Sequence, residues 1–188
     1  MNLIIFGPPG AGKGTQSNFI SNKYNLFQLS TGEILRDQIK KKTELGIKIS
    51  PIINSGSFVS DEIVSELIEK YIKNEMYKNK IIFDGYPRSL QQVKNLETLL
   101  IKYKQKIDLV IKLSVSLETI KKRILERRTL EKRADDDEEI AVKRYNTYEK
   151  STEPVIEHYK KLNLLKVIDG ERSIDQINKE ISDIIALI

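Results

Sequence analysis

A glycine-rich loop near the amino end constrains the fold of this chain more than any other feature. Residues 7–15 read Gly-Pro-Pro-Gly-Ala-Gly-Lys-Gly-Thr and follow a short apolar run at 2–6. A helical pattern begins inside the loop and covers 12–24. Glycine permits tight backbone turns, and the unpaired amide groups that open a helix attract anions. The order of strand, loop and helix predicts a nucleotide phosphate site, with Lys13 reaching the β- and γ-phosphates.

The loop departs from the generic phosphate-binding motif at one position. The generic motif has Ser or Thr directly after its lysine, whereas this chain has Gly14 there and places the hydroxyl at Thr15. The usual assignment of that hydroxyl to a metal ion therefore does not transfer directly.

Short apolar runs alternate with helical patterns along the rest of the chain. Strands are predicted at 2–6, 26–29, 80–84, 108–113 and 164–168. Apolar stripes with helical spacing predict helices around 63–72, 90–100 and 174–185. Ser30 with Glu33 and Ser173 with Gln176 match the capping box that starts a helix. This alternation predicts an α/β fold with a five-stranded parallel sheet, covered by helices on both faces.

Two stretches interrupt the alternation. Residues 31–60 hold two helical pieces without a strand, and Pro51 is expected to interrupt the second piece. Residues 127–137 are polar and charged, without periodicity. Polar excursions near strand ends commonly hold ligands, so both stretches are candidate binding regions.

Composition excludes several other classes of protein. The chain of 188 residues has no cysteine and one histidine, His158, so disulfides are excluded and we expect no zinc site. It has no apolar run long enough to span a membrane and no signal peptide, which predicts a cytoplasmic location. The net charge of +5 comes with lysine runs such as 40–42 that lack interleaved aromatic residues. We interpret these lysines as solvated surface and expect no nucleic-acid partner.

A second motif follows the third predicted strand. Residues 84–88 read Asp-Gly-Tyr-Pro-Arg. Asp84 can hold Mg²⁺ through water, Gly85 lets the chain turn closely over a ligand, and Arg88 offers a bidentate fork to a phosphate. Together with the glycine loop, this motif predicts a second phosphate site beside the first.

These motifs together resemble the nucleoside monophosphate kinases, and adenylate kinase is the most similar family. The resemblance rests on 7–15, on Ser-Thr-Gly-Glu at 30–33 with Arg36, on 84–88, and on Arg-Ala-Asp-Asp at 133–136. It covers essentially the whole chain in order. It implies one P-loop NTPase-like kinase unit with a core of 1–29, 60–125 and 137–188, a small helical monophosphate-binding region at 30–59 and a short lid at 126–136. The lid lacks the longer hairpin that sometimes carries zinc, and we expect a monomer.

The resemblance assigns one set of residues to ATP. Residues 10–15 would hold the triphosphate, Arg123 would pack against the base, and Arg127 would reach the phosphates from the lid edge. Arg172 lies where the backbone approaches the base, so its side chain need not contribute. The expected ATP-binding residues are Gly10, Ala11, Gly12, Lys13, Gly14, Thr15, Arg123, Arg127 and Arg172.

A second set is assigned to AMP and to the transferring phosphoryl group. Arg36 and Arg88 would hold the AMP phosphate, and Arg133 and Arg144 would clamp the phosphoryl group. The expected AMP-binding residues are Thr31, Arg36, Ser57, Phe58, Val59, Gly85, Tyr86, Pro87, Arg88, Gln92, Arg133 and Arg144. The expected catalytic residues are Lys13, Arg88, Arg127, Arg133 and Arg144, with Mg²⁺ held through water at Asp84.

The implied reaction is Mg-ATP + AMP ⇌ 2 ADP, which maintains the balance of adenine nucleotides. The acceptor is already an oxyanion, so no general base is needed and His158 is expected to be structural or solvated. Closure of the lid would exclude water as a competing acceptor. Asp135 and Asp136 are expected to pair with lid arginines in the closed state.

Three alternatives remain at this point. A UMP/CMP kinase is the nearest, and Thr31 with Gln92 favours AMP because an amide can both donate to and accept from the adenine edge. A small GTPase would need Asn-Lys-x-Asp and Asp-x-x-Gly motifs, which we do not find. A nucleic-acid-binding ATPase would show salt-sensitive binding of RNA or DNA.

Overall fold

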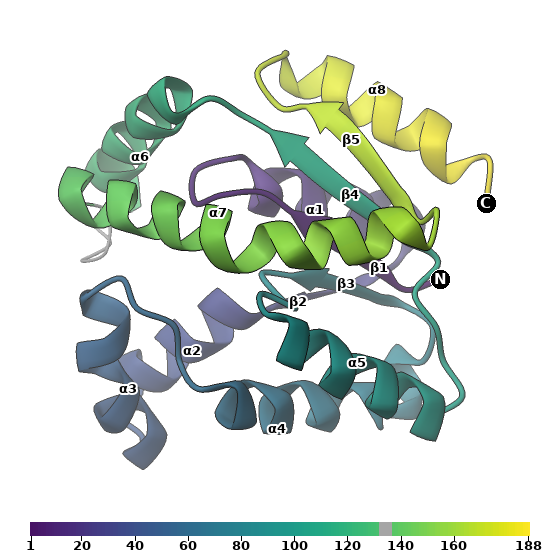
Figure 1. Ribbon diagram of the computed structural model, residues 1–188, viewed down its shortest axis with the longest axis horizontal. Helices are drawn as coiled ribbons and strands as arrows, with labels where there is room; N and C mark the ends of the chain where they lie inside the picture. Colours follow the sequence, from purple (N-terminus) through teal and green to yellow (C-terminus); the bar gives the residue numbers. More distant parts are fainter. Residues whose placement is uncertain (132–136) are drawn as a thin grey trace.

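The computed structural model describes residues 1–131 and 137–188, which contain a five-stranded parallel sheet. The strands are β1 (Leu3–Phe6), β2 (Phe27–Ser30), β3 (Ile81–Asp84), β4 (Leu109–Ser114) and β5 (Leu165–Asp169). They lie in the order β2-β3-β1-β4-β5 (Figure 1). The α/β fold and all five predicted strands are confirmed, with each strand end within one residue of its predicted position.

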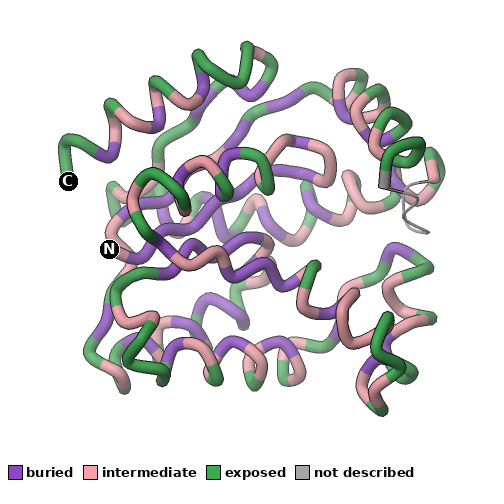
Figure 2. The backbone as a smooth tube through the Cα atoms, turned by 180° about the vertical axis from the view of Figure 1, so that it is seen from behind, coloured by how far each residue is buried: buried purple, intermediate pink, exposed green. Residues whose placement is uncertain are grey.

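Alternate residues of each strand pack on opposite faces of the sheet. Ile4 and Phe6 join one buried cluster, whereas Leu3 and Ile5 join the other. The first cluster lies under α4 (Asp61–Ile72), α5 (Leu90–Lys102) and α7 (Glu138–Lys161). The second lies under α1 (Lys13–Tyr24), α6 (Leu117–Glu131) and α8 (Ile174–Ile185). Figure 2 shows the buried strands running through the middle of the molecule, between helices that are partly exposed. Coverage of both faces explains why β1 and β3, in the middle of the sheet, are buried at every position.

The predicted helical stripes are correct except at their first residues. Val93, Leu96 and Leu100 are buried on α5, and Ile177, Ile181 and Ile185 are buried on α8. Leu90 and Ile174, which begin the two helices, are exposed. The correct helical period therefore does not guarantee burial at the start of a helix. Of the helices in residues 1–131 and 137–188, none is long and apolar enough to cross a membrane.

The first excursion forms α2 (Thr31–Lys40) and α3 (Glu44–Asn54), which lie at one end of the molecule in Figure 1. A Cβ added at Gly46 would lie 2.0 Å from the Gln38 carbonyl oxygen, so glycine permits the close approach of α3 to α2. The expected interruption at Pro51 is wrong, because α3 continues to Asn54. Pro51 is exposed, and the carbonyl that loses its donor belongs to Ile47, which is 67% exposed, so water can replace the missing hydrogen bond.

One of the two predicted capping boxes is confirmed. The Ser173 side chain accepts from the Gln176 backbone amide, and the Gln176 side chain accepts from the Ser173 amide. The box predicted at Ser30 is wrong, because the Ser30 side chain makes no capping hydrogen bond within the described part of the chain. Ser30 still belongs to β2 and pairs with Asp84 of β3, so the chain passes from strand to helix without a separate cap.

The second excursion begins as a helix. Residues 127–131 lack an apolar period, yet α6 continues through them to Glu131. This last part of α6 projects beyond the sheet (Figure 1), so it forms a helix without needing an apolar stripe. Arg133, Asp135 and Asp136 lie outside the described residues. On the far side, α7 runs without a break through Pro154.

Candidate active site

A cavity of about 820 Å³ lies at the carboxyl ends of the strands. The phosphate loop, α2 and the residues after β3 contribute to its walls, together with α6, α7 and the segment after β5. β1 lies between β3 and β4, so the chain leaves the centre of the sheet toward both edges. In open parallel sheets, ligands bind at such a switch of direction, outside the carboxyl ends of the strands.

The phosphate loop takes its shape from glycines in the left-handed region. Gly10 has φ +83° and Gly12 has φ +92°. A Cβ at Gly10 would lie 3.1 Å from the Ile124 side chain and 3.3 Å from the Ile120 carbonyl oxygen. The loop therefore lies directly against α6, and any side chain at Gly10 would separate them.

The Lys13 ammonium group is held by the loop itself. Its Nζ donates to the carbonyl oxygens of Gly7, at 2.8 Å, and Pro8, at 3.0 Å. Burial lowers the pKa of Lys13 to about 8, the nearby Asp84 carboxylate opposes this shift, and the charges of Arg88, Arg144 and Arg127 add to it. A bound anion with several charges would offset both the cost of burying the ammonium charge and its repulsion by the arginines. A polyphosphate is such an anion.

Gly14 differs from the other glycines of the loop. It lies in the first turn of α1, is exposed, and does not have a positive φ. A Cβ added there would meet no heavy atom of the described residues within 4 Å. The backbone therefore does not require glycine at this position, unlike Gly10 and Gly12.

Asp84 ends β3 beside the loop and is 7% exposed. Its Oδ2 accepts a hydrogen bond of 3.0 Å from Nε2 of Gln28 on the neighbouring strand β2. One carboxylate with substrate phosphates and water is a common donor set for Mg²⁺ in kinases, so Asp84 fits the expected ion. Among the described residues, no cluster of three or more His, Asp or Glu side chains forms a separate metal site.

The Arg88 guanidinium lines the cavity beside Gly85 and Phe58. Its Nε donates to the Gly85 carbonyl oxygen at 2.7 Å, and its Cζ lies 4.9 Å from the centre of the Phe58 ring. Burial lowers the pKa of Arg88 to about 10, and the charges of Arg144 and Arg36 contribute to the shift, while Asp84 opposes it. Three arginines from different elements therefore act on one region of the cavity.

A short polar network closes the wall near Gln92. The Gln92 side chain is 3% exposed although it lines the cavity. Its Oε1 accepts from the Arg88 backbone amide at 2.7 Å, and its Nε2 donates to Oδ1 of Asp61 at 2.7 Å. Thr31, also nearly buried, donates its hydroxyl to the Gly85 carbonyl oxygen at 3.0 Å. The Thr31 oxygen can therefore only accept from a ligand.

The loop after α3 packs against α7. Gly56 is buried, and a Cβ there would lie 3.1 Å from the Ile140 side chain and 3.2 Å from the Arg144 side chain. Lys143 donates to the Ser55 carbonyl oxygen at 2.7 Å. Gly56 and Arg144, which both line the cavity, thus bring the loop after α3 against α7.

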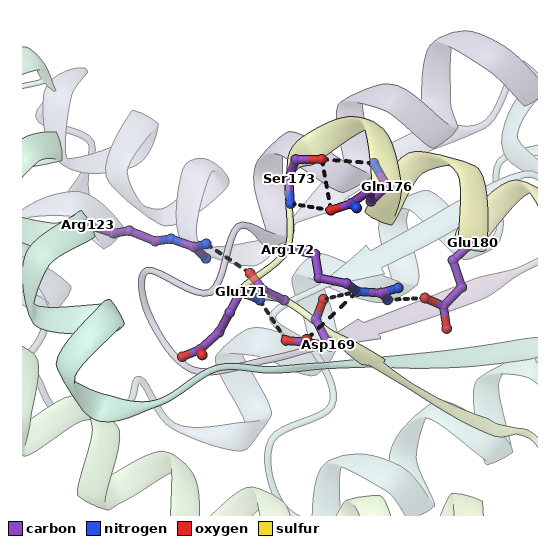
Figure 3. A network of polar contacts seen from close by, with 8 residues as sticks. Arg123, Asp169, Glu171, Arg172, Ser173, Gln176 and Glu180 are labelled. Atoms are coloured by element: carbon purple, nitrogen blue, oxygen red, sulfur yellow. Dashed lines mark hydrogen bonds and ion pairs between the residues drawn. The ribbon is translucent and has the colours of Figure 1, made fainter.

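The opposite side of the cavity is held by contacts between arginine side chains and main-chain oxygens. Arg123 donates to the Gly170 carbonyl oxygen at 2.9 Å (Figure 3). It also donates to the Ala11 carbonyl oxygen, at 3.5 Å. Figure 3 also shows the Arg172 guanidinium held between Asp169 and Glu180. Arg123 joins the phosphate loop to the segment after β5, while Arg172 stabilises that segment.

Most of the predicted site residues line the cavity. Within the described part of the chain, only Tyr86 and Pro87 do not. Tyr86 is fully buried in the core and donates to the Gln92 carbonyl oxygen at 3.2 Å, so it supports the wall from behind. Arg133 lies outside the described residues. His158 lies away from the cavity, where its Nε2 contacts Oε1 of Glu97 at 2.8 Å.

The sequence did not reveal three contributors to the site. Gln28, Asp61 and Gly56 are joined to the predicted residues only by tertiary contacts. Asp61 did carry a weak signal, since an acidic residue at the start of a helix is common. That pattern predicts a helix end, and it gives no indication of a contact with Gln92.

The family comparison decides between the kinase families. The family model described as adenylate kinase matches residues 5–164. The chain belongs to the adenylate kinase family. The match spans the phosphate loop, the acceptor region and the helices that carry the cavity arginines, so the expectation from the motifs is confirmed.

Individual members of the adenylate kinase family align along the full length of the chain. The adenylate kinase of Pelagibacter ubique (strain HTCC1062) is 46% identical, over 98% of this chain and 99% of the relative. That of Petrotoga mobilis is 37% identical, over 98% and 97%. That of Porphyromonas gingivalis is also 37% identical, over 98% and 95%. The first two alignments cover 211 and 212 positions, so these relatives carry residues that this chain lacks, whereas the third covers 185.

Proposed function

We propose that this chain transfers the terminal phosphoryl group of Mg-ATP to AMP, giving two molecules of ADP. The observation that carries the proposal is one continuous cavity, lined by the glycine loop at 10–15 and by the polar side chains of Thr31, Arg88 and Gln92. Lys13 of the loop and Arg88 of the acceptor end both have a lowered pKa and would be stabilised by phosphates. Membership of the adenylate kinase family supports the same reaction.

The donor end would bind ATP mainly through the backbone. Residues 10–15 would cradle the phosphates, and the Lys13 ammonium would exchange its two carbonyl partners for phosphate oxygens. Arg123 would lie beside the base, at the junction of the loop and the segment after β5. Bound Mg²⁺ would supply charge neutralisation at the phosphates, and Asp84 would hold it through water.

The acceptor end would bind AMP through side chains. Arg36 and Arg88 would take its phosphate, while Thr31, the 57–59 loop and Gln92 would surround the base. Gly85 would bring the backbone close to the ligand, with Tyr86 and Pro87 behind it. Arg127 and Arg144 would neutralise charge on the phosphoryl group during transfer, because such transition states spread negative charge over several oxygens.

The lid assignment at 126–136 and the clamping role of Arg133 are part of this proposal. The Porphyromonas gingivalis relative, which aligns with almost no extra residues, supports the short form of the lid. Charged pairs between Asp135 or Asp136 and arginines would hold a closed state. The monomeric state and the cytoplasmic location stay predictions from the sequence.

A four-acceptor assay tests the proposal. The purified chain is supplied with Mg-ATP and, in turn, with AMP, UMP, CMP or GMP, and ADP production is followed by a coupled reaction. We expect the highest kcat/KM with AMP. Faster turnover of UMP or CMP would replace the proposal with the pyrimidine alternative, and hydrolysis stimulated by nucleic acid without any acceptor activity would replace it with an ATPase.

A further inference from the structure

Asp61 lies outside every motif that identified the site, yet it contacts the residue expected to read the base. It occupies the first position of α4, and its Oδ1 accepts from Nε2 of Gln92 at 2.7 Å. Its Oδ2 accepts from the Ser89 hydroxyl at 2.9 Å. The carboxylate is therefore held from two sides at a fixed position beside the Gln92 amide.

The oxygen of the Gln92 amide has a hydrogen-bond donor as its partner, whereas the nitrogen has an acceptor. Its Oε1 accepts from the backbone N–H of Arg88 at 2.7 Å. A carboxylate can only accept and a backbone N–H can only donate, whereas a carboxamide can turn over and exchange its oxygen and nitrogen. Turning over would place two donors together at Arg88 and two acceptors together at Asp61. These partners therefore determine one orientation of the amide by their chemistry.

This orientation matters because the amide keeps one N–H and one oxygen lone pair for a ligand. Adenine presents a donor at its 6-position, whereas guanine and hypoxanthine present an acceptor there. The neighbouring ring nitrogen is an acceptor in adenine and carries a hydrogen in the other two bases. An amide that turns over freely can satisfy either pattern, but an amide with a fixed order of oxygen and nitrogen satisfies only one.

We propose that Asp61 is a specificity-determining positioning residue, which fixes the orientation of Gln92 so that the acceptor site takes adenine and rejects 6-oxopurine monophosphates. The inference rests on the proposed function, because it concerns the base of the acceptor nucleotide. Asp61 would act through Gln92, to which it is hydrogen-bonded.

A structural role for Asp61 is the competing explanation. An acidic residue in the first turn stabilises a helix through its dipole, and Ser60 makes no capping hydrogen bond within the described residues. Glu62 is exposed in the same first turn and provides a matched control. Loss of helix stability alone would change the thermal midpoint of unfolding and leave the choice between two bases unchanged.

The test compares AMP with inosine monophosphate, which differs from AMP only at the base edge in question. The variants are D61N, D61A, Q92A, the double variant D61N/Q92A and the control E62A. Asparagine has the shape of aspartate but offers a donor as well as an acceptor. In D61N the partner at position 61 therefore no longer determines the orientation of the Gln92 amide. We measure kcat/KM for both acceptors with saturating Mg-ATP, binding of both monophosphates by calorimetry, and thermal unfolding of every variant.

We expect the AMP-to-IMP ratio of kcat/KM to fall about fivefold in D61N and about tenfold or more in D61A, since hydrogen bonds to charged groups are the stronger ones. The calorimetric binding ratio should fall in parallel, while kcat at saturating AMP stays within about twofold. E62A should keep the ratio of the unmodified chain. The D61N/Q92A double variant should match Q92A, because Asp61 has no effect on specificity once the amide is gone.

An unchanged ratio in D61N would overturn the proposal, and so would additive effects in the double variant. If D61A does not fold, D61N and the double variant still decide the question. Failure of the proposed function looks different, because the unmodified chain would then prefer a pyrimidine monophosphate before any substitution is made.

Discussion

The two ends of the cavity are built in opposite ways. At the donor end, one continuous segment at 7–15 forms the site, and its cation Lys13 is held by carbonyl oxygens of the same segment. At the acceptor end, Thr31, Asp61, Arg88 and Gln92 come from α2, α4, the segment after β3, and α5. The loop after α3 and the side of α7 complete this end.

The two constructions suit two different tasks: binding the phosphates that all nucleotides share, and recognising one particular base. Phosphates are alike in every nucleotide, so a backbone loop with a helix end is sufficient to bind them. A base is recognised by the order of its donors and acceptors, which needs side chains held in fixed orientations. Substitutions at the donor end should therefore change the rate of transfer, whereas substitutions at the acceptor end should change the choice and affinity of the acceptor.

The largest expected effect is at Lys13. Lys13→Met should lower kcat by about a hundredfold or more, because one preorganised charge at the transferring group is worth that much in typical enzymes. AMP affinity, measured by calorimetry, should change little. The exposed Lys122→Met on α6 is the matched control. A kcat within tenfold of that of the unmodified chain would show that the loop backbone alone stabilises the transferring phosphoryl group at the donor end.

The next effect concerns the acceptor end. Gly85 has φ +79°, and a Cβ there would lie 2.7 Å from Nη2 of Arg88 and 3.1 Å from Oγ1 of Thr31. Gly85→Ala should raise the KM for AMP by about tenfold or more, because it strains the backbone and displaces the arginine head. The KM for ATP should stay the same. Equal changes in both KM values would contradict the separation of the two ends.

The pH dependence should also differ between the two ends. The pKa of Lys13 is about 8 in the folded chain without ligand, and that of Arg88 is about 10. Because kcat/KM reports the free enzyme, kcat/KM for ATP should fall above about pH 8, by up to about tenfold per pH unit, as Lys13 loses its proton. With saturating ATP, kcat/KM for AMP should hold until about pH 10. Coincident declines would contradict this prediction.

The same shift predicts a change in stability with a definite sign. The folded pKa of Lys13 lies below its ordinary value of 10.5, so the unfolded chain binds more protons between about pH 8 and 10.5. The contribution of Lys13 to stability therefore increases as pH rises through this window, and it is lost as pH falls toward 8. Denaturant unfolding at several pH values should show this increase, and it should be missing in Lys13→Met.

The smallest expected effect is at Gly14. Gly14→Ala should raise the free energy of unfolding by about 0.5–1 kcal/mol, since alanine favours a helix and the added methyl meets no described atom within 4 Å. The KM for ATP should change less than about twofold, because generic phosphate loops carry a side chain at this position. A large loss of ATP affinity would show that the phosphates pass closer to Gly14 than the loop backbone suggests.

The sequence was most informative where structure is local. The glycine spacing of 7–15, the strand runs and the motif at 84–88 each depend on neighbours along the chain, and the structure places all of them as expected. Expectations were wrong at Ser30 and Pro51. In both cases the local pattern was real, but packing or solvent exposure determined the result.

The sequence by itself determined the α/β fold, the family and the two phosphate-binding motifs, because short-range spacing and hydrophobic period encode them. Only the tertiary structure brought Asp61 to Gln92, Gln28 to Asp84 and the Gly56 loop to α7. These contacts join residues about 30 to 90 positions apart and depend on how helices pack on the sheet, so no spacing in the chain encodes them. The glycine loop thus predicts a phosphate site, while the packing around Gln92 would determine which base the proposed acceptor site takes.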